Sequence, residues 1–69
     1  MEDTLFLKEM GRKIKEARIA KKLSYPKFSK LTGVDMSALW FIEQGRRNTH
    51  LLTLKAIADK LGVDVKDFL

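Results

Sequence analysis

The sequence predicts an all-α fold, a compact domain of five short helices. Apolar residues recur at three- and four-residue steps through most of the chain, and the alternating β-branched pattern of strands is missing. Four Gly and one Pro divide this helical pattern into short segments. A chain of 69 residues can build one compact core but not several, so we expect a single domain over residues 1–69.

The first two helices are indicated by an apolar stripe and by capping residues. A first helix is expected over about residues 3–22, with a stripe formed by Leu7, Met10, Ile14 and Ala17. Leu23 follows as a core residue, and Ser24 is suited to cap a second helix over residues 25–31. Pro26 fits the first turn of that helix, because the amide that it lacks would have no partner there.

A third helix is expected close behind the second. Asp35 is suited to cap it over residues 36–44, and Gly45 can end it in the left-handed conformation. Two short helices with so short a connection predict a helix-turn-helix, because Gly33 permits the sharp crossing and Val34 can seal the corner between them.

Two further elements complete the chain. A fourth amphipathic helix is indicated by the spacing of Leu51, Leu54, Ile57, Ala58 and Leu61. Gly62 ends this helix, and Asp64 can cap a final short helix that ends at Phe68 and Leu69.

Composition excludes several classes of protein and of site. Lys and Arg outnumber Asp and Glu by 14 to 9, which gives a formal charge of +5. The chain has no Cys and one His, so we expect no disulfide, no metal site, no cofactor and no catalytic residues, and hence no enzyme. No apolar run approaches the roughly 20 residues of a membrane span, and Glu2 and Asp3 stand where a secretory signal carries positive charge. We therefore expect a soluble cytoplasmic protein that does not bind membranes.

Several segments together carry a resemblance to a known family. They are GRKIKEAR (11–18), LS (23–24), LTGV (31–34), IEQGRRN (42–48) and TLKAIADKLGV (53–63). On these segments the chain resembles helix-turn-helix domains of the phage-repressor and Cro type over nearly its whole length. The resemblance implies that the third helix enters the DNA major groove, that Arg18 pairs with Glu43, and that the protein dimerises through its C-terminal helices. Val65, Phe68 and Leu69 would serve either that dimer seam or the monomer core.

The chain departs from the family pattern on one surface. The outward positions of the third helix usually carry polar or basic residues, and here they are Met36, Ser37, Ala38, Trp40 and Phe41. Leu39 and Ile42 suffice to seat this helix, so Phe41, about 200° around the helix from Leu39, must point outward. Residues 35–45 hold two acids and no Lys or Arg, whereas residues 8–22 account for a charge of +5.

These departures lead to a first hypothesis, that the chain is an engineered protein-binding module on a helix-turn-helix scaffold. The third helix would dock on a partner protein that offers a hydrophobic groove or patch. The candidate protein-binding residues are Tyr25, Met36, Ser37, Ala38, Trp40, Phe41 and His50. Among them, His50 would add pH sensitivity to the contact.

The alternative is a sequence-specific DNA-binding transcriptional regulator that acts as a dimer. Its candidate DNA-binding residues are Ser37, Arg46, Arg47 and Asn48, of which the last three match the phosphate-contacting loop of the family. Base recognition would then depend on Ser37 and on apolar contacts to thymine methyl groups. A third alternative makes the apolar face of the third helix a homodimer seam.

Overall fold

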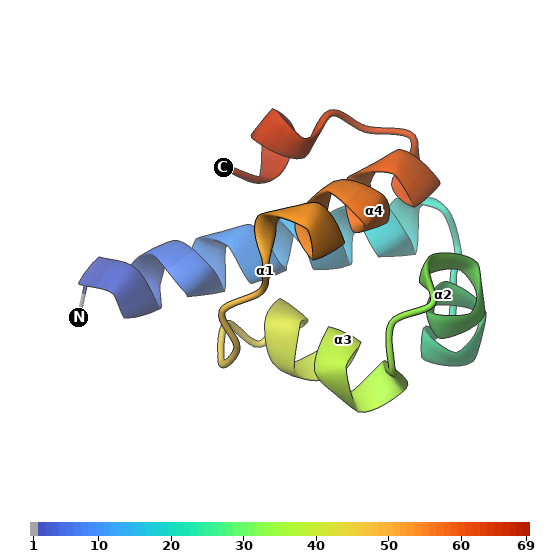
Figure 1. Cartoon of the computed structure of the whole chain (residues 1–69), viewed down its shortest axis with the longest axis horizontal. Coiled ribbons are helices and arrows are strands. Elements are labelled where there is room, and N and C mark those ends of the chain that lie inside the picture. The colour runs from blue at the N-terminus through green and yellow to red at the C-terminus, as the bar shows by residue number, and fades with distance from the viewer. Residues whose placement is uncertain (1) are drawn as a thin grey trace.

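The computed structural model describes residues 2–69 as four α-helices followed by a 3-10 helix (Figure 1). The elements are α1 (Glu2–Ala20), α2 (Tyr25–Thr32), α3 (Met36–Glu43), α4 (Leu51–Leu61) and the 3-10 helix η1 (Val65–Phe68). The all-α expectation is confirmed, and the first three helices begin and end within two residues of the predicted positions. The expectation of five helices is wrong, because the last element is not an α-helix.

The last element is a single tight turn. Its backbone amides bond three residues back, from Asp67 to Asp64 at 2.9 Å and from Leu69 to Lys66 at 3.1 Å, which is the 3-10 pattern. Asp64 caps it as expected, and the backbone amide of Asp64 donates a hydrogen bond to the side chain of Asp67. The turn carries Phe68 into the core and leaves Leu69 exposed.

The first helix ends earlier than the apolar pattern predicts. Lys22 adopts the left-handed conformation at φ 56°, and this reversal ends α1 at Ala20. The amide of Leu23 then donates to the carbonyl of Arg18 at 3.2 Å, which closes the helix end. Because Lys22 stands where such a helix end usually has Gly, the sequence does not predict that α1 ends here.

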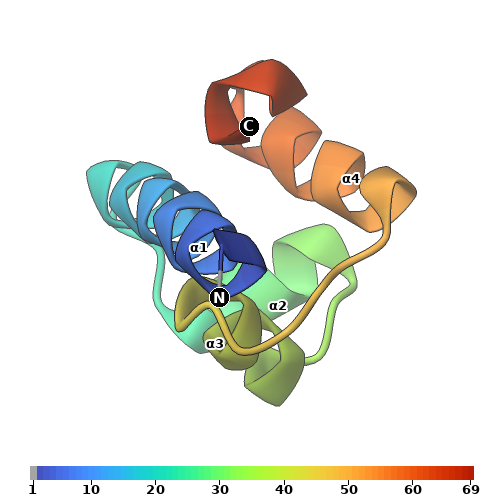
Figure 2. The ribbon, with the colours of Figure 1, turned by 90° about the vertical axis from the view of Figure 1, so that its left-hand side faces the viewer.

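The core lies between α1, α2 and α4, with α3 and η1 closing it. Helix α1 packs against α3 and η1, and α2 packs against α3 and α4. The two views of the ribbon place α3 and η1 on opposite sides of the molecule (Figures 1 and 2). The buried apolar residues are Met10, Ile14, Phe28, Leu39, Ile42, Leu54, Ile57, Ala58, Leu61 and Phe68.

One member of the predicted stripe on α4 is not buried. Leu51 is 64% exposed, so the buried side of α4 begins at Leu54. The first turn of α4 extends past the core, and Leu51 lines a groove there with Phe6 and Leu69. In the part of the chain that the structure describes, no helix is long and apolar enough to cross a membrane.

Gly11 allows α1 to approach the end of α3 closely. A Cβ atom at Gly11 would overlap the carbonyl oxygens of Ile42 and Glu43. The bare backbone of α1 therefore sets how near the C-terminal end of α3 can lie.

Gly11→Ala should lower the free energy of unfolding, although helix propensity alone favours Ala by about 1 kcal/mol. The added methyl group meets backbone atoms, and overpacking of this kind costs about 3 kcal/mol. The net loss of roughly 2 kcal/mol corresponds to a Tm lower by roughly 10 °C, measured by circular dichroism. A matched control is Gly33→Ala, which has open space around it and should cost about 1 kcal/mol of left-handed strain. An unchanged or raised Tm for Gly11→Ala would contradict the close approach.

Candidate nucleic-acid interface

The turn between α2 and α3 is held by its own hydrogen bonds. Gly33 is left-handed at φ 77°, and its amide donates to the carbonyl of Ser29 at 2.8 Å. The Ser29 hydroxyl donates to the carbonyl of Val34 at 2.6 Å, and the Val34 amide donates to Oγ1 of Thr32 at 3.2 Å. Thr32 in turn donates to the carbonyl of Phe28 at 2.8 Å. These contacts fix α3 relative to α2, and they confirm the predicted role of Gly33. Val34 is partly buried against the core.

Helix α3 turns one apolar side inward and another outward. Leu39 and Ile42 are buried, as expected from their spacing. Met36 is 46% exposed, Trp40 40% and Phe41 39%, so the predicted exposure of all three is confirmed. We call Met36, Trp40 and Phe41 the apolar strip. Its residues lie outside the buried core, and the exposed part of each side chain can contact a ligand.

Specific contacts order both the strip and the start of α3. The rings of Trp40 and Phe41 pack edge to face, with centroids 5.1 Å apart and planes at 79°. Asp35 caps α3 by accepting hydrogen bonds from both the hydroxyl and the amide of Ser37. The Ser37 hydroxyl bond, followed by backbone bonds and the charge of Arg47, lowers the pKa of Asp35. A carboxylate therefore stands at the start of α3, with a cation near it.

A shallow groove of about 310 Å³ runs beside α3 and joins it to the loop before α4. It is lined by Gly33, Val34, Ala38, Ile42, Arg47, Thr49, His50 and Thr53. The structure thus brings together Ala38, Arg47 and His50 from the predicted site residues. Arg46 and Asn48 are exposed in the same loop, and His50 begins α4 without a side-chain capping bond.

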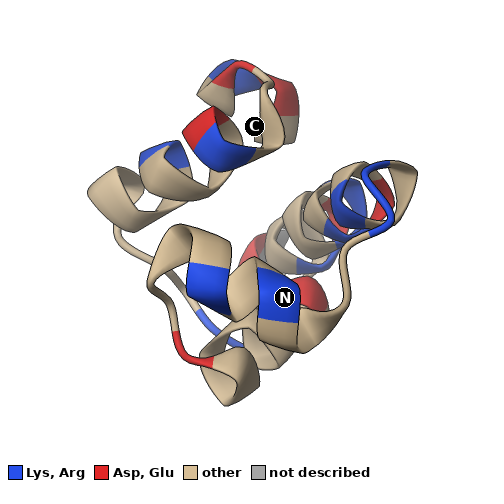
Figure 3. Cartoon of the chain, turned by 90° about the vertical axis from the view of Figure 1, so that its right-hand side faces the viewer, with Lys and Arg blue, Asp and Glu red and all other residues tan. Residues whose placement is uncertain are grey.

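The cations of the molecule lie around α3 rather than on it. Figure 3 shows Lys and Arg on α2 and at the C-terminal end of α1, while α3 contains neither residue type. Lys27 and Lys30 are the exposed cations of α2. Sequence reasoning did not single them out, although their three-residue spacing places both on one side of a helix.

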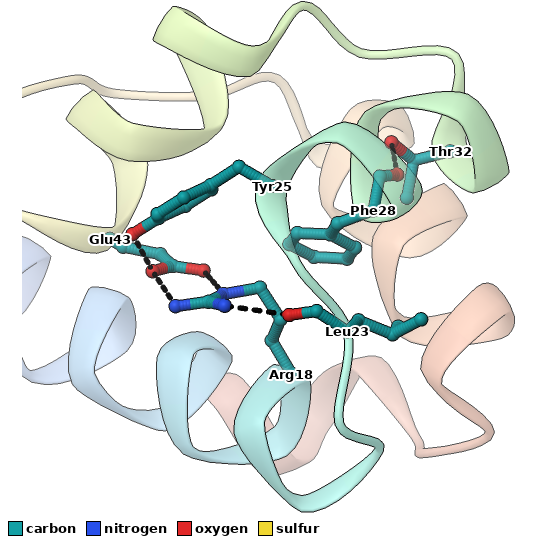
Figure 4. A network of polar contacts seen from close by, with 6 residues as sticks. All are labelled: Arg18, Leu23, Tyr25, Phe28, Thr32 and Glu43. Carbon is teal, nitrogen blue, oxygen red and sulfur yellow. Dashed lines mark hydrogen bonds and ion pairs between the residues drawn. The ribbon is translucent and has the colours of Figure 1, made fainter.

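A buried polar network ties α3 to α1 and α2 (Figure 4). Arg18 Nε donates to Glu43 Oε2 at 2.8 Å, and its Nη1 donates to the carbonyl of Leu23 at 2.7 Å. The Tyr25 hydroxyl donates to Glu43 Oε1 at 2.6 Å, and the Arg18 guanidinium lies 4.1 Å from the centre of the Tyr25 ring. Figure 4 places all three side chains together between their helices. The expected pairing of Arg18 with Glu43 is confirmed.

This network gives Tyr25 a structural role beside the proposed one. Tyr25 was predicted to border the exposed face of α3, and the structure shows it half-buried with its hydroxyl bonded to Glu43. Burial, and then the hydrogen bond to Glu43, raises the pKa of Tyr25. Burial alone would lower the pKa of Arg18, but its bonds to Glu43 outweigh burial and raise it.

Among the side chains of residues 3–69 no group of three or more His, Cys, Asp or Glu could hold a metal ion. The geometry instead combines an outward helix face, a fixed turn and a cationic loop.

Comparison with protein families identifies the family to which this fold belongs. A helix-turn-helix family model, HTH_3, matches residues 14–68. The chain belongs to the HTH_3 helix-turn-helix family. This family comprises DNA-binding regulators and not enzymes, in agreement with the prediction that the chain is no enzyme.

Solved structures resemble this HTH_3 domain closely. The restriction-modification controller protein C.AhdI from Aeromonas hydrophila is 30% identical with a TM-score of 0.87, and the match covers 91% of this chain and 96% of that one. An HTH_3 family transcriptional regulator from Vibrio cholerae is 30% identical with a TM-score of 0.88, covering 96% of this chain and 37% of that one.

A third similar structure shows the fold alone. It is the clp gene regulator ClgR from Corynebacterium glutamicum, at 21% identity and a TM-score of 0.86, covering 91% of this chain and 67% of that one. None of the curated proteins matches the sequence closely enough to be counted as a relative.

The comparisons correct the first hypothesis drawn from the sequence. They support a DNA-binding regulator fold, and nothing in them indicates an engineered binder or a partner protein with a hydrophobic groove. The apolar strip is a property of this HTH_3 domain that membership of the family does not explain.

Glu43→Ala should lower the free energy of unfolding by about 3–5 kcal/mol, because it leaves the Arg18 guanidinium buried without a counter-charge. Urea denaturation followed by Trp40 fluorescence measures this loss. The matched control is Glu16→Ala, which breaks the exposed pair with Arg12 and should cost less than about 1 kcal/mol. Similar losses in the two variants would contradict the central role of the buried pair.

Tyr25 should titrate above its ordinary pKa of about 10 in the folded protein. Because the folded state holds the phenolic proton more tightly, the stability from this contact is complete below about pH 10 and is lost as the pH rises through the folded-state pKa. Tyrosinate absorbance reports this residue alone, since the chain has one Tyr. The same titration in concentrated urea is the control and should centre near 10. A folded-state midpoint at or below the unfolded one would contradict the contact.

Proposed function

We propose that this protein is a sequence-specific DNA-binding transcriptional regulator that acts as a dimer in the cytoplasm. The observation that carries the proposal is the fixed α2–turn–α3 unit with a cationic loop beside it, in a chain of the HTH_3 family. Helix α3 would enter the major groove, as the second helix of such units does. The two relatives at 30% identity, a restriction-modification controller and a transcriptional regulator, support this function.

The phosphate contacts would come from elements around α3. Arg46, Arg47 and Asn48 form the exposed loop after α3, and Arg47 shares a groove with Ala38 of α3. Lys27 and Lys30 would add cations from α2. Contacts of this kind position a protein on the duplex and supply a large share of its affinity.

The dimer would form through apolar side chains away from α3. Phe6, Leu51 and Leu69 are exposed and line a groove of about 390 Å³ with Leu7 and Met10. Exposed apolar surface of this kind is typical of protein interfaces, and the family resemblance implies dimers made by the C-terminal elements.

A second candidate function is protein binding through the apolar strip. The observation that favours it is the exposure of Trp40, Phe41 and Met36 on a helix without Lys or Arg. Trp and Met are enriched at the centres of protein interfaces. The candidate residues at its border would be Ser37, Ala38 and His50. DNA titration separates this function from the first.

Duplex DNA should quench or shift the fluorescence of Trp40, the only Trp in the chain, and the binding constant should fall steeply with salt. Arg47→Ala should weaken binding to all duplexes alike and reduce the slope of log K against log salt by about one. The fluorescence titration at several salt concentrations measures both quantities.

The matched control is Lys66→Ala, which removes one positive charge from η1 on the side opposite α3 (Figures 1 and 2). It should leave the affinity and the salt slope nearly unchanged. Absence of any DNA binding at low salt, with an unchanged Trp40 emission, would overturn the proposed function and favour protein binding.

A further inference from the structure

The exposed side of α3 has few polar side chains that could hydrogen-bond to the edge of a DNA base. Residues 36–43 contain no Lys, Arg, Asn or Gln, and these are the side chains that form bidentate bonds with guanine or adenine. The Ser37 hydroxyl donates its proton to Asp35. Gln44 is exposed but caps the C-terminal end of α3, whereas the N-terminal part of a recognition helix contacts the bases.

The apolar strip therefore determines what α3 can recognise. In the major groove the only apolar group on a base is the C5-methyl of thymine, and 5-methylcytosine carries a methyl at the same place. The Phe41 ring is braced edge to face by Trp40, and Met36 lies one turn before Trp40 on α3. These side chains offer a wide apolar surface, and the indole N–H of Trp40 is their only hydrogen-bond donor.

The charges around the strip fit a DNA groove rather than an apolar pocket. Arg47 shares a groove with Ala38 of α3, and its charge acts on Asp35 at the start of the helix. Lys27 and Lys30 are exposed on α2, which packs against α3. An apolar face with a cation beside it is complementary to methyl groups beside phosphates.

Resting on the proposed function, we propose that α3 recognises pyrimidine C5-methyl groups in the major groove through Met36, Trp40 and Phe41. Specificity then comes from burying methyl groups, and affinity comes from the cations around α3. Each methyl group buried should tighten binding about four-fold. Thymine and 5-methylcytosine are the two bases that present this group.

The test compares pairs of duplexes that differ only in these methyl groups. One pair is an alternating A·T duplex and the same duplex with deoxyuridine in place of thymidine. The other pair is an alternating G·C duplex and the same duplex with 5-methylcytosine in place of cytosine. Binding is measured by Trp40 fluorescence at one fixed salt concentration. We expect the methylated member of at least one pair to bind four-fold or more tightly, with the salt slope unchanged within the pair.

A double variant, Met36→Ala with Phe41→Ala, tests whether the strip causes the preference. Both side chains are exposed, so the fold should persist, and the preference for the methylated duplex should fall to less than two-fold. The control Leu52→Ala removes an 80% exposed apolar side chain from α4 and should keep the full preference.

The outcomes separate the inference from the function on which it rests. Equal affinity within both pairs, in a protein that binds all the duplexes, would overturn methyl recognition and leave DNA binding intact. An undiminished preference in the double variant, which keeps only Trp40 of the strip, would also overturn it. If only the A·T pair shows tighter binding of the methylated duplex, thymine is the base that α3 recognises. If only the G·C pair shows it, the base is 5-methylcytosine. Failure to bind any duplex at low salt would overturn the proposed function itself, and the strip would then be a surface for protein.

Discussion

The buried ion pair between Arg18 and Glu43 fixes how three helices meet. Moving two charges out of water costs several kcal/mol per ion, so such a pair is tolerated only when its geometry is good and its other hydrogen bonds are made. Both conditions hold here: Glu43 accepts bonds from Arg18 and Tyr25, and Arg18 also donates to the carbonyl of Leu23. Among the residues that the structure describes, no buried side-chain N or O atom lacks a partner. Because any shift of α1, α2 or α3 would break one of these bonds, the network specifies a single arrangement.

Because Glu43 is held in this ion pair, the outer face of α3 lacks the one acidic residue of the helix. The one acid within α3 points inward and is neutralised by Arg18, and the helix has no basic residue. The face is left with the apolar strip, Ser37 and the capping carboxylate of Asp35. Positive charge has to come from α2 and from the Arg46–Arg47 loop, whose placement depends on the fixed turn and on the end of α3. The positive charges therefore lie on the segments next to α3, while α3 itself presents an apolar surface.

Local signals predicted most of the fold, and tertiary constraints account for what was missed. The caps at Ser24 and Asp35 and the left-handed Gly33 depend on residues nearby in the chain, so the sequence predicts them well. The left-handed Lys22 closes α1 through local backbone bonds, but it stands where a helix end usually has Gly and so has no distinctive sequence pattern. The close approach at Gly11 depends on contacts that form only when α1 and α3 pack. The exposed strip was predicted from helix geometry, because buried positions on α3 were already filled. Its interpretation as an engineered binder has no support in the comparisons, because the composition of one face does not reveal its origin.

The apolar strip and the cationic loop beside it limit the kinds of partner that α3 can bind. Leu39 and Ile42 seat the helix, so stability of the monomer does not require Met36, Trp40 or Phe41 on the outside. Large apolar side chains left in water are typical of an interface. A purely apolar protein groove offers no counter-charge to the arginines beside the strip, and burying them there without a partner would cost free energy. The DNA major groove presents apolar methyl groups between rows of phosphates, so it can satisfy the strip and the cations at once. The carboxylate of Asp35 opposes phosphate at this site, and the nearby charge of Arg47 offsets that repulsion.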